Sequence, residues 1–281
     1  MDTVQSDVLR LTDPFPNGEL RLYGLIGDPV SQVRAPHPAT QLMRKAGLNG
    51  ALVPLHVRAE NLARIFSTLG SIENIDGLVI TVPHKIAMAE LVDDLSERAR
   101  LVGAINIARH DGRGRWLGDI VDGLGFVRGL EQIGFDPMGA EALVVGAGGA
   151  GSAIATELVV RGAHVRVYDS SLNRATALVR RLRLGGFEKI ELAERSDPGG
   201  ASLVVNATPL GMKLGDPLPV DPGLLKPAMT VAEVVTSPAN TALLEYARHI
   251  GCRIQFGEAM MLNQLHLMLD FFSGGRSGNR P

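Results

Sequence analysis

The chain has 281 residues, of which 45% are hydrophobic and 21% charged, and its formal net charge is −2. A chain of this length and composition is typical of a globular protein with a substantial core and room for two domains. The basic residues are scattered along it, so we expect neither nucleic acid nor a membrane as a partner, and a small polar metabolite instead.

Cysteine use and the first residues indicate the compartment. Cys252 is the single cysteine of the chain, so an internal disulfide is excluded. It lies in an apolar run, which favours a strand position over a role as nucleophile. Residues 1–7 lack the basic region and the apolar core of a signal peptide, and no apolar stretch approaches the length of a membrane span. The histidines follow no metal-ligand spacing. We therefore expect a cytoplasmic protein without a metal site.

The first part of the chain alternates between strand-like and helix-like segments after a lead-in at residues 1–19. The patterns predict strands at residues 20–26, 51–55, 77–82, 104–108 and 115–118. They predict helices at residues 36–46, 61–69, 86–92 and 96–102. Asp111-Gly112 is a turn signal that makes the last two strands a hairpin. The nearly continuous apolar run at residues 77–82 is typical of a strand buried on both faces, so we expect a mostly parallel sheet covered by helices.

The same alternation continues after a helix expected at residues 124–133. Further strands are predicted at residues 142–146, 164–169, 189–192, 202–206, 230–235 and 252–256. Further helices are predicted at residues 153–160, 172–184, 240–250 and 258–272. The last helix is long and apolar, and we expect it to return to the first domain. Residues 273–281 form a polar, glycine-rich tail.

Three glycines after the strand at residues 142–146 stand at the G-x-G-x-x-G spacing. Gly146 permits a tight turn, Gly148 lets the backbone approach a pyrophosphate, and Gly151 allows close packing of helix and strand. Asp169 ends the next strand, where an acid can accept hydrogen bonds from ribose hydroxyl groups. The alternative is that Asp169 caps the helix that begins near Ser170. With all these parts in order, the sequence predicts a dinucleotide site.

The predicted fold is α/β with two domains. Residues 1–123 and 245–281 form an open, mostly parallel α/β substrate domain, to which the C-terminal helix returns. Residues 124–244 form a Rossmann, doubly wound domain that binds NAD(P).

Several longer motifs occur in one order along the chain. They are Thr81-Val-Pro-His-Lys85, Gly103-Ala-Ile-Asn106, Leu117-Gly-Asp-Ile-Val-Asp122-Gly-Leu-Gly125, Asn206-Ala-Thr-Pro-Leu-Gly-Met212, Ser237-Pro-Ala-Asn-Thr-Ala-Leu-Leu244 and Gly257-Glu-Ala-Met-Met-Leu-Asn-Gln264. Together with the glycine motif, they resemble the shikimate dehydrogenase family over residues 20–272. The resemblance implies an oxidoreductase that holds its substrate between the two domains.

In that family a lysine and an aspartate flank the hydroxyl or ketone that is converted, and these positions match Lys85 and Asp122. Burial favours the neutral amine of a lysine, whereas a neighbouring carboxylate favours the charged form. We therefore assign Lys85 as the proton carrier and Asp122 as its positioner and a hydroxyl acceptor. The alternatives are a solvated lysine near the start of a helix and an aspartate that caps the helix beginning at Gly123.

The resemblance also assigns substrate hydroxyl groups to Thr81, Asn106 and Gln264, although a buried amide could serve only the backbone. The family's two serines that hold the substrate carboxylate fall on Val33 and Ala35. Other polar positions of the family site have changed as well, and they are Val79, Ile120, Val121 and Thr236. A buried carboxylate without donors is costly, so we expect shikimate to fit poorly unless Arg34 or Gln32 turns towards it.

Cofactor contacts are expected from three segments of the second domain and from the start of the last helix. The residues are Gly146, Ala147, Gly148, Gly149, Ala150, Gly151, Asp169, Ser170, Arg174, Asn206, Ala207, Thr208, Pro209 and Gly257. The commonest family form has Asn-Arg-Thr where this chain has Asp169-Ser-Ser171, and its arginine holds a 2′-phosphate. An acid repels that phosphate, so we predict NAD over NADP, with Arg174 as the one nearby cation that could oppose this preference.

These features predict an NAD-dependent oxidoreductase that transfers hydride reversibly between nicotinamide and a ring hydroxyl or ketone of a shikimate-like cyclic polyol. A first alternative is an authentic shikimate or quinate dehydrogenase, reducing 3-dehydroshikimate in aromatic amino acid biosynthesis or acting in quinate catabolism. A second is a non-catalytic NAD-binding regulator, which the retention of Lys85 and Asp122 disfavours. The sequence leaves a homodimer open.

Overall fold

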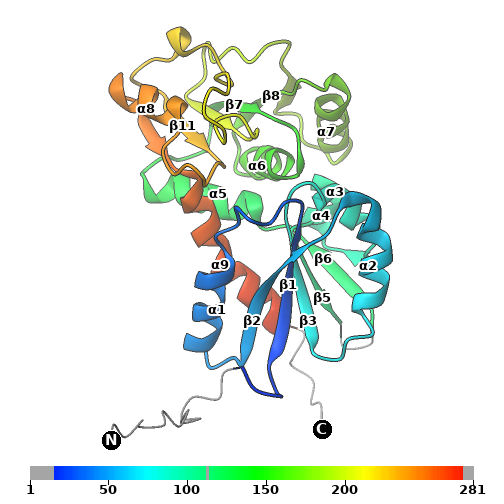
Figure 1. The fold of residues 1–281 in the computed structure, drawn as a ribbon. Helices are drawn as coiled ribbons and strands as arrows, with labels where there is room; N and C mark the ends of the chain where they lie inside the picture. The colour runs from blue at the N-terminus through cyan, green and yellow to red at the C-terminus, as the bar shows by residue number, and fades with distance from the viewer. Residues whose placement is uncertain (1–15, 112–113, 275–281) are drawn as a thin grey trace, which may run out of the picture.

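The computed structural model describes residues 16–111 and 114–274. Most of the expected lead-in, Gly112 of the expected turn and most of the expected tail lie outside these residues. The described chain forms two six-stranded sheets, which lie one above the other in Figure 1. Each sheet is covered by helices on both faces, so the α/β fold with two units is confirmed.

The first sheet has the strand order β2-β1-β3-β5-β6-β4. Its strands are β1 (Arg21–Gly27), β2 (Gly50–His56), β3 (Ile75–Ile80), β4 (Asp94–Leu95), β5 (Ile107–His110) and β6 (Trp116–Asp119). Strand β1 pairs in parallel with β2 and β3, whereas β5 runs antiparallel to both β3 and β6, as the predicted hairpin requires. The two-residue strand β4 was not predicted, because two residues are too few to produce a periodic pattern.

Alternating residues of β3 separate the two faces of this sheet. Leu78 and Ile80 pack among residues of the helices α2, α3 and α4, and Val79 between them packs towards α1 and α9. These helices are α1 (Pro36–Lys45), α2 (Leu62–Leu69), α3 (Lys85–Ala89), α4 (Glu97–Val102) and α9 (Gly257–Ser273), with a 3-10 turn η1 (Ala59–Asn61) before α2. Burial on both faces explains why the sequence of β3 is a continuous apolar run.

The second sheet is entirely parallel, with the order β12-β11-β10-β7-β8-β9. Its strands are β7 (Glu141–Val145), β8 (His164–Tyr168), β9 (Ile190–Leu192), β10 (Leu203–Asn206), β11 (Thr230–Glu233) and β12 (Arg253–Gln255). Its helices are α5 (Asp122–Gln132), α6 (Gly149–Val160), α7 (Leu172–Leu184) and α8 (Ala242–His249), with a 3-10 turn η2 (Pro222–Leu224). Ala142 and Val144 face α5, α6 and α7, whereas Leu143 and Val145 face α8. This arrangement is the predicted doubly wound fold.

One predicted limit differs from the sheet pairing. Residues 245–256 were assigned to the substrate domain, but β12 pairs in parallel with β11 and is the edge strand of the second sheet. The reason is that α8 makes one more crossover of the parallel sheet before the chain leaves it. Helix α9 does return to the first sheet, where the rings of Phe272 and Tyr23 lie 4.7 Å apart.

The chain passes between the two sheets twice, through α5 and into α9. Helix α5 packs against both α6 and α9, and Figure 1 places it on the left of the junction between the two sheets.

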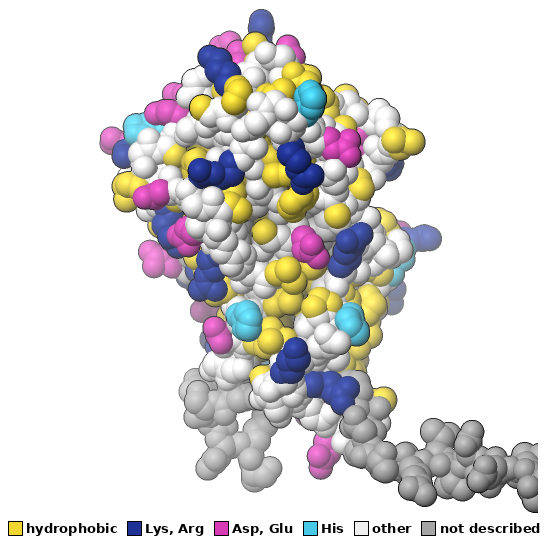
Figure 2. Space-filling view, turned by 90° about the vertical axis from the view of Figure 1, so that its left-hand side faces the viewer, with side chains coloured by type: hydrophobic (Ala, Val, Ile, Leu, Met, Phe, Trp, Pro, Cys, Tyr) yellow, Lys and Arg dark blue, Asp and Glu magenta, His cyan; other side chains and the backbone are white. Residues whose placement is uncertain are grey.

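No helix in the described part of the chain is long and apolar enough to cross a membrane. On the face drawn in Figure 2, basic and acidic side chains are interspersed.

Candidate active site

Four polar side chains meet at one end of the first sheet. Lys85 follows β3 and Asp122 follows β6, so both lie beyond the carboxyl ends of strands that share an edge. Asn106 directly precedes β5, and because β5 is antiparallel to both neighbours, its amino end lies at that same edge. Gln264 reaches the group from the middle of α9. Relative exposures of 9% for Lys85, 1% for Asp122, 2% for Asn106 and 5% for Gln264 place the group out of bulk water.

The carboxylate of Asp122 is the centre of this group. Its Oδ2 accepts a hydrogen bond from Lys85 Nζ. Its Oδ1 accepts from Asn106 Nδ2 and from Gln264 Nε2, each at 3.0 Å. Asn106 Nδ2 is also 3.2 Å from Gln264 Oε1, and Asn106 Oδ1 accepts from the backbone N–H of Val121 at 2.9 Å. The two amides therefore fix one carboxylate oxygen, and the other faces the lysine.

The structure places Asp122 differently from a helix cap. The cap position of α5 is Val121, and Asp122 is the first residue of the helix proper, with its carboxylate engaged by three side chains. A negative charge at this end of a helix is favoured by the helix dipole. Lys85 does begin α3, as the alternative of a surface lysine supposed, but it is buried.

His84 is a residue of this site that the sequence did not reveal. It is 1% exposed, and its Nε2 lies 2.6 Å from the carbonyl oxygen of Val57 at the end of the neighbouring segment. The carbonyl of Lys85 in turn accepts from the N–H of Ile105 at 2.9 Å. These two contacts fix the His84 side chain and the carbonyl group of Lys85. A histidine between a proline and a lysine carries no sequence signal for such a contact.

The glycine loop has the shape that a dinucleotide requires. Gly146 has φ of +108°, and a Cβ there would lie 2.8 Å from the carbonyl oxygen of Ala207. A Cβ on Gly151 would lie 1.9 Å from the carbonyl oxygen of Gly146, so the helix can approach the strand only without a side chain. Above Gly148 a Cβ would meet nothing within 4 Å, and Gly148 is the cap residue of α6. An anionic group fits this open space, because the first N–H groups of α6 are available to it.

Gly149 brings the glycine loop against Lys85. A Cβ on Gly149 would lie 2.8 Å from Lys85 Cβ and 3.0 Å from its Cδ. The aliphatic stem of Lys85 therefore packs directly on the start of α6, in the other half of the molecule. The glycine loop and the hydrogen-bonded group around Asp122 are therefore adjacent in this structure.

Asp169 binds the glycine loop from the end of β8. Its Oδ2 accepts from the N–H of Ala147 at 2.7 Å, and its Oδ1 accepts from the N–H of Ser171 at 2.7 Å and from Arg174 Nη2 at 2.9 Å. Its side chain is 5% exposed, whereas that of Arg174 is 53% exposed. Asp169 thus holds both the loop and the turn into α7, although the cap position itself is Ser171. Ser170 is exposed.

The loop after β10 lies against the glycine loop and is held by Asn206. Asn206 Oδ1 accepts from the N–H and the hydroxyl of Thr208 at 3.1 and 2.7 Å, and its Nδ2 donates to the carbonyl of Leu210 at 3.0 Å. These bonds set the path of Ala207, Thr208 and Pro209. Gly257 lies against the loop after β11, since a Cβ on it would be 2.2 Å from the carbonyl oxygen of Val235.

A second residue that the sequence did not reveal is Glu233, at the end of β11. It is 0% exposed, and its Oε2 lies 3.0 Å from Thr241 Oγ1 and 3.4 Å from Asn206 Nδ2. Its Oε1 has no hydrogen-bond partner among the described residues. Burial raises the pKa of Glu233 to about 7, against the opposing effect of these two hydrogen bonds. The run Val231-Ala-Glu-Val-Val235 gave the appearance of an ordinary apolar strand.

Most of the positions where this chain replaces polar residues of the family lie in or against one apolar cluster. Val79 and Val121 belong to the buried core between β1, β3, α1 and α9, and Val33 and Ala35 pack against the same core. Ile120 is buried on the other face of the sheet. Arg34 is exposed. None of these apolar side chains offers a hydrogen-bond donor.

Two further predicted residues lie outside the hydrogen-bonded group. Thr81 is half-buried just after β3, and Thr236 is half-buried after β11, in the other half of the molecule. Of the residues expected to act on substrate, the structure brings together Lys85, Asp122, Asn106 and Gln264.

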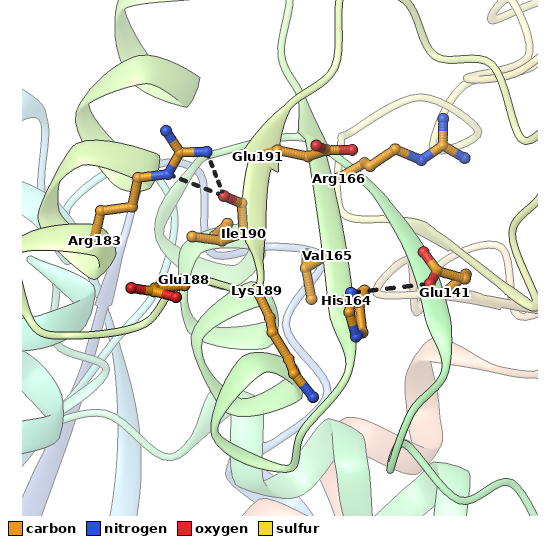
Figure 3. Close-up of a pocket in the computed structure, with 9 residues that line it drawn as sticks. All are labelled: Glu141, His164, Val165, Arg166, Arg183, Glu188, Lys189, Ile190 and Glu191. Carbon is orange, nitrogen blue, oxygen red and sulfur yellow. Dashed lines mark hydrogen bonds and ion pairs between the residues drawn. The ribbon is translucent and has the colours of Figure 1, made fainter.

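A surface hollow at the far end of the second sheet is unrelated to this site. It lies at the amino ends of β7, β8 and β9, and Figure 3 shows it with its charged lining. The lining mixes both signs, and Arg183 is already bound to the carbonyl of Ile190 at 3.0 and 3.2 Å. Ligands of doubly wound sheets bind beyond the carboxyl ends of the strands, which is the opposite edge.

The chain resembles known proteins over nearly all of its length. Residues 25–108 match the family model described as the shikimate dehydrogenase substrate binding domain. The shikimate dehydrogenase (NADP(+)) of Rubrobacter xylanophilus is 40% identical over 258 residues, which cover 89% of this chain and 90% of that protein. The protein of the same name from Rhodospirillum rubrum is 37% identical over 258 residues, covering 88% and 89%.

Solved structures with the same fold carry different names. The shikimate dehydrogenase of Aquifex aeolicus is 27% identical with a TM-score of 0.83, covering 92% of this chain and 94% of that one. The quinate dehydrogenase of Corynebacterium glutamicum in complex with NAD is 31% identical with a TM-score of 0.79, covering 90% and 94%. The 5-ketofructose reductase of Gluconobacter sp. strain CHM43 is 28% identical with a TM-score of 0.80, covering 92% and 94%.

Proposed function

The chain belongs to the shikimate dehydrogenase family, and from that premise we propose that it is an NAD(P)-dependent oxidoreductase that interconverts a hydroxyl and a ketone on a polyol. The observation that carries this proposal is the buried Lys85–Asp122 pair, packed directly against the glycine loop through Gly149. A proton-transfer group and a dinucleotide loop side by side are what the oxidation of an alcohol needs. A regulator without catalysis would have no use for that buried pair.

The residues that would hold the dinucleotide are those of the glycine loop and the acid beyond it. The N–H groups at the start of α6 would bind the pyrophosphate above Gly148, and Asp169 would accept hydrogen bonds from a ribose. Bound there, the nicotinamide supplies or accepts the hydride. The loop held by Asn206 would border the same ligand.

Lys85 Nζ is the group that gives or takes the hydroxyl proton. Asp122 Oδ1 is already saturated by Asn106 and Gln264, so Oδ2 can hold the ammonium group in one place and also accept from a substrate hydroxyl. Because the group is buried, the hydrogen bonds to these charges are not weakened by bulk water. Asp122 is thus the positioner and Lys85 the proton carrier.

The substrate that we propose is a polyol or keto-sugar without a carboxylate. Val33 and Ala35, at the positions of the family's carboxylate-binding serines, pack against an apolar cluster and offer no donor to a charged group. An unpaired carboxylate buried there would be strongly unfavourable. The Gluconobacter relative is named for 5-ketofructose, which has no carboxylate, and this name supports the proposal.

A second candidate, an authentic shikimate or quinate dehydrogenase, is favoured by the names of the Rubrobacter and Corynebacterium relatives. It would need Arg34, which is exposed, to turn towards the carboxylate. The test is a panel of purified substrates, shikimate, quinate and uncharged polyols and keto-sugars, assayed by nicotinamide absorbance with each cofactor. A kcat/KM for shikimate above that for every uncharged substrate would select the second candidate.

For the cofactor we propose a preference for NAD. Asp169 places a buried carboxylate at the site where a 2′-phosphate would lie, and the guanidinium of Arg174 is bound to that carboxylate. The Corynebacterium relative is described in complex with NAD, whereas the Rubrobacter relative is named for NADP(+). For the compartment we propose the reducing cytoplasm, on the ground of the single, buried cysteine.

A further inference from the structure

One basic side chain crosses from the second half of the molecule to the first. Arg181, on α7, donates from Nη1 to the carbonyl of Val102, the last residue of α4, at 2.5 Å. The next residue, Gly103, has φ of +71°, and a Cβ there would lie 2.6 to 2.9 Å from three guanidinium atoms. The guanidinium therefore fills the space that the glycine leaves at the end of α4.

This contact is an unusual place for a cation. Burial lowers the pKa of the Arg181 guanidinium, and the group donates to a neutral carbonyl, that of Val102. The negative end of the α4 dipole compensates only in part. Neighbouring contacts reinforce the junction, since Leu101 of α4 packs into the core of the second half and a Cβ on Gly185 would lie 2.8 Å from its Cδ2.

The contact lies opposite to the two chain crossings. In Figure 1, α5 and α9 occupy the left of the junction, whereas α4 and α7 lie on the right. Two crossings on one side act as a hinge, and a bond on the other side fixes the angle between the halves.

The end of α4 is also connected to the catalytic group. Asn106 follows Gly103 by three residues, and Ile105 between them donates to the carbonyl of Lys85. A shift of Val102 would therefore reach both Asn106 and Lys85 within one short segment.

We propose that Arg181 is a positioning residue that sets the angle between the two halves, and with it the approach of the dinucleotide to the substrate. This inference rests on the proposed function, because hydride transfer requires a donor held by one half to meet an acceptor held by the other. Small misplacements of reacting atoms reduce rates strongly.

The test compares Arg181→Ala, Arg181→Lys and the control Arg180→Ala, which alters the adjacent, exposed arginine of the same helix. With Arg181→Ala we expect kcat to fall by about tenfold or more, the cofactor KM to change less than about twofold, and the isotope effect from deuterated reduced nicotinamide to rise. Arg181→Lys should restore part of the rate, and Arg180→Ala should match the wild type.

A second readout does not depend on activity. Spin labels at Ala63→Cys on α2 and Ala177→Cys on α7, in a Cys252→Ser background, report the distance between the halves by electron–electron resonance. Arg181→Ala should broaden or lengthen the distribution with NAD present, and Arg180→Ala should not. An unchanged distribution overturns the proposal, and so does an unchanged isotope effect, even if the unfolding temperature falls. If the wild type turns over no substrate, the proposed function fails, and the distribution alone decides whether Arg181 sets the angle.

Discussion

Restoring two serines at the apolar end of the cleft tests the proposed substrate class. The double substitution Val33→Ser with Ala35→Ser places two hydroxyl donors on the loop between β1 and α1, at the positions where the family holds a carboxylate. Both side chains are half-buried against the core of α1 and α9. We expect activity on shikimate to rise and activity on an uncharged substrate to stay unchanged or fall.

The size of the gain follows from the hydrogen bonds. A hydroxyl that donates to a carboxylate contributes about 1.5–3 kcal/mol, and we take the lower value because the loop is half-exposed. Each serine should then raise kcat/KM for shikimate by about tenfold, and the pair by about a hundredfold.

The variant should remain folded. Replacing a half-buried Val33 loses about 1 kcal/mol of apolar burial. Ala35 precedes α1 with helical backbone angles rather than the extended ones of a capping residue, so a serine there is expected to add no cap bond. The net change is expected to be a loss of about 1 kcal/mol in the free energy of unfolding, from the lost burial of Val33.

The assay follows nicotinamide absorbance with shikimate and with an uncharged keto-sugar such as 5-ketofructose. The matched control is Val33→Ala, which opens the same space without adding a donor, and it should not help shikimate. Efficient oxidation of shikimate by the unmodified protein, abolished by Arg34→Ala, would refute the reasoning and establish the shikimate dehydrogenase candidate.

Three further predictions concern the catalytic lysine, the cofactor and a buried acid. Lys85→Met and Lys85→Ala should both lower kcat by about a hundredfold or more, but only Lys85→Ala, which also removes the stem packed on Gly149, should alter the cofactor Kd measured by nicotinamide fluorescence. Equal effects of the two on Kd would contradict that packing. Asp169→Asn with Ser170→Arg should shift the ratio of kcat/KM values towards NADP by about tenfold or more, and an unchanged ratio would exclude Asp169 as the discriminator. Burial raises the pKa of Glu233 to about 7 from its ordinary 4.5, so between these two pH values the folded state binds more protons than the unfolded state. The free energy of unfolding should therefore fall by about 3 kcal/mol as pH rises from 4.5 to 7. Glu233→Gln should remove this loss, as denaturant unfolding at pH 5 and pH 8 will measure, and equal pH slopes in both proteins would be evidence against it.

The meeting of Lys85 with Asp122 is a part of the site that the sequence could predict. Each residue follows a predicted strand of one sheet, and the carboxyl ends of such strands meet at one edge. The roles of Gly146 and Gly151 were also predictable, because a tight turn and a close helix leave no room for a side chain. These predictions depend only on local pattern and on the geometry of parallel sheets.

Other contacts depend on how separate elements dock, and no local pattern encodes that. Gln264 reaches Asn106 across 158 positions of the chain, and only the family resemblance suggested it. Arg181 has the spacing of an ordinary solvated residue on an amphipathic helix, and its contact with Val102 exists only because the two halves pack together. The same holds for β12, whose pairing with β11 follows from a crossover that the composition of residues 245–256 does not mark.

The structure also explains how apolar side chains can stand beside the hydrogen-bonded group around Asp122 without disturbing it. Val121 replaces a polar residue of the family, yet it supports Asn106 through its backbone N–H, which every residue except proline provides. Its side chain can therefore join the apolar cluster without loosening the bonds that Asn106 makes to Asp122. Val33 and Ala35 lie on the loop between β1 and α1, which carries none of the four side chains grouped around Asp122, and they pack against the core that contains Val79. We therefore expect substitutions at Val33 and Ala35 to change the proposed substrate contacts while the hydrogen bonds around Asp122 stay in place.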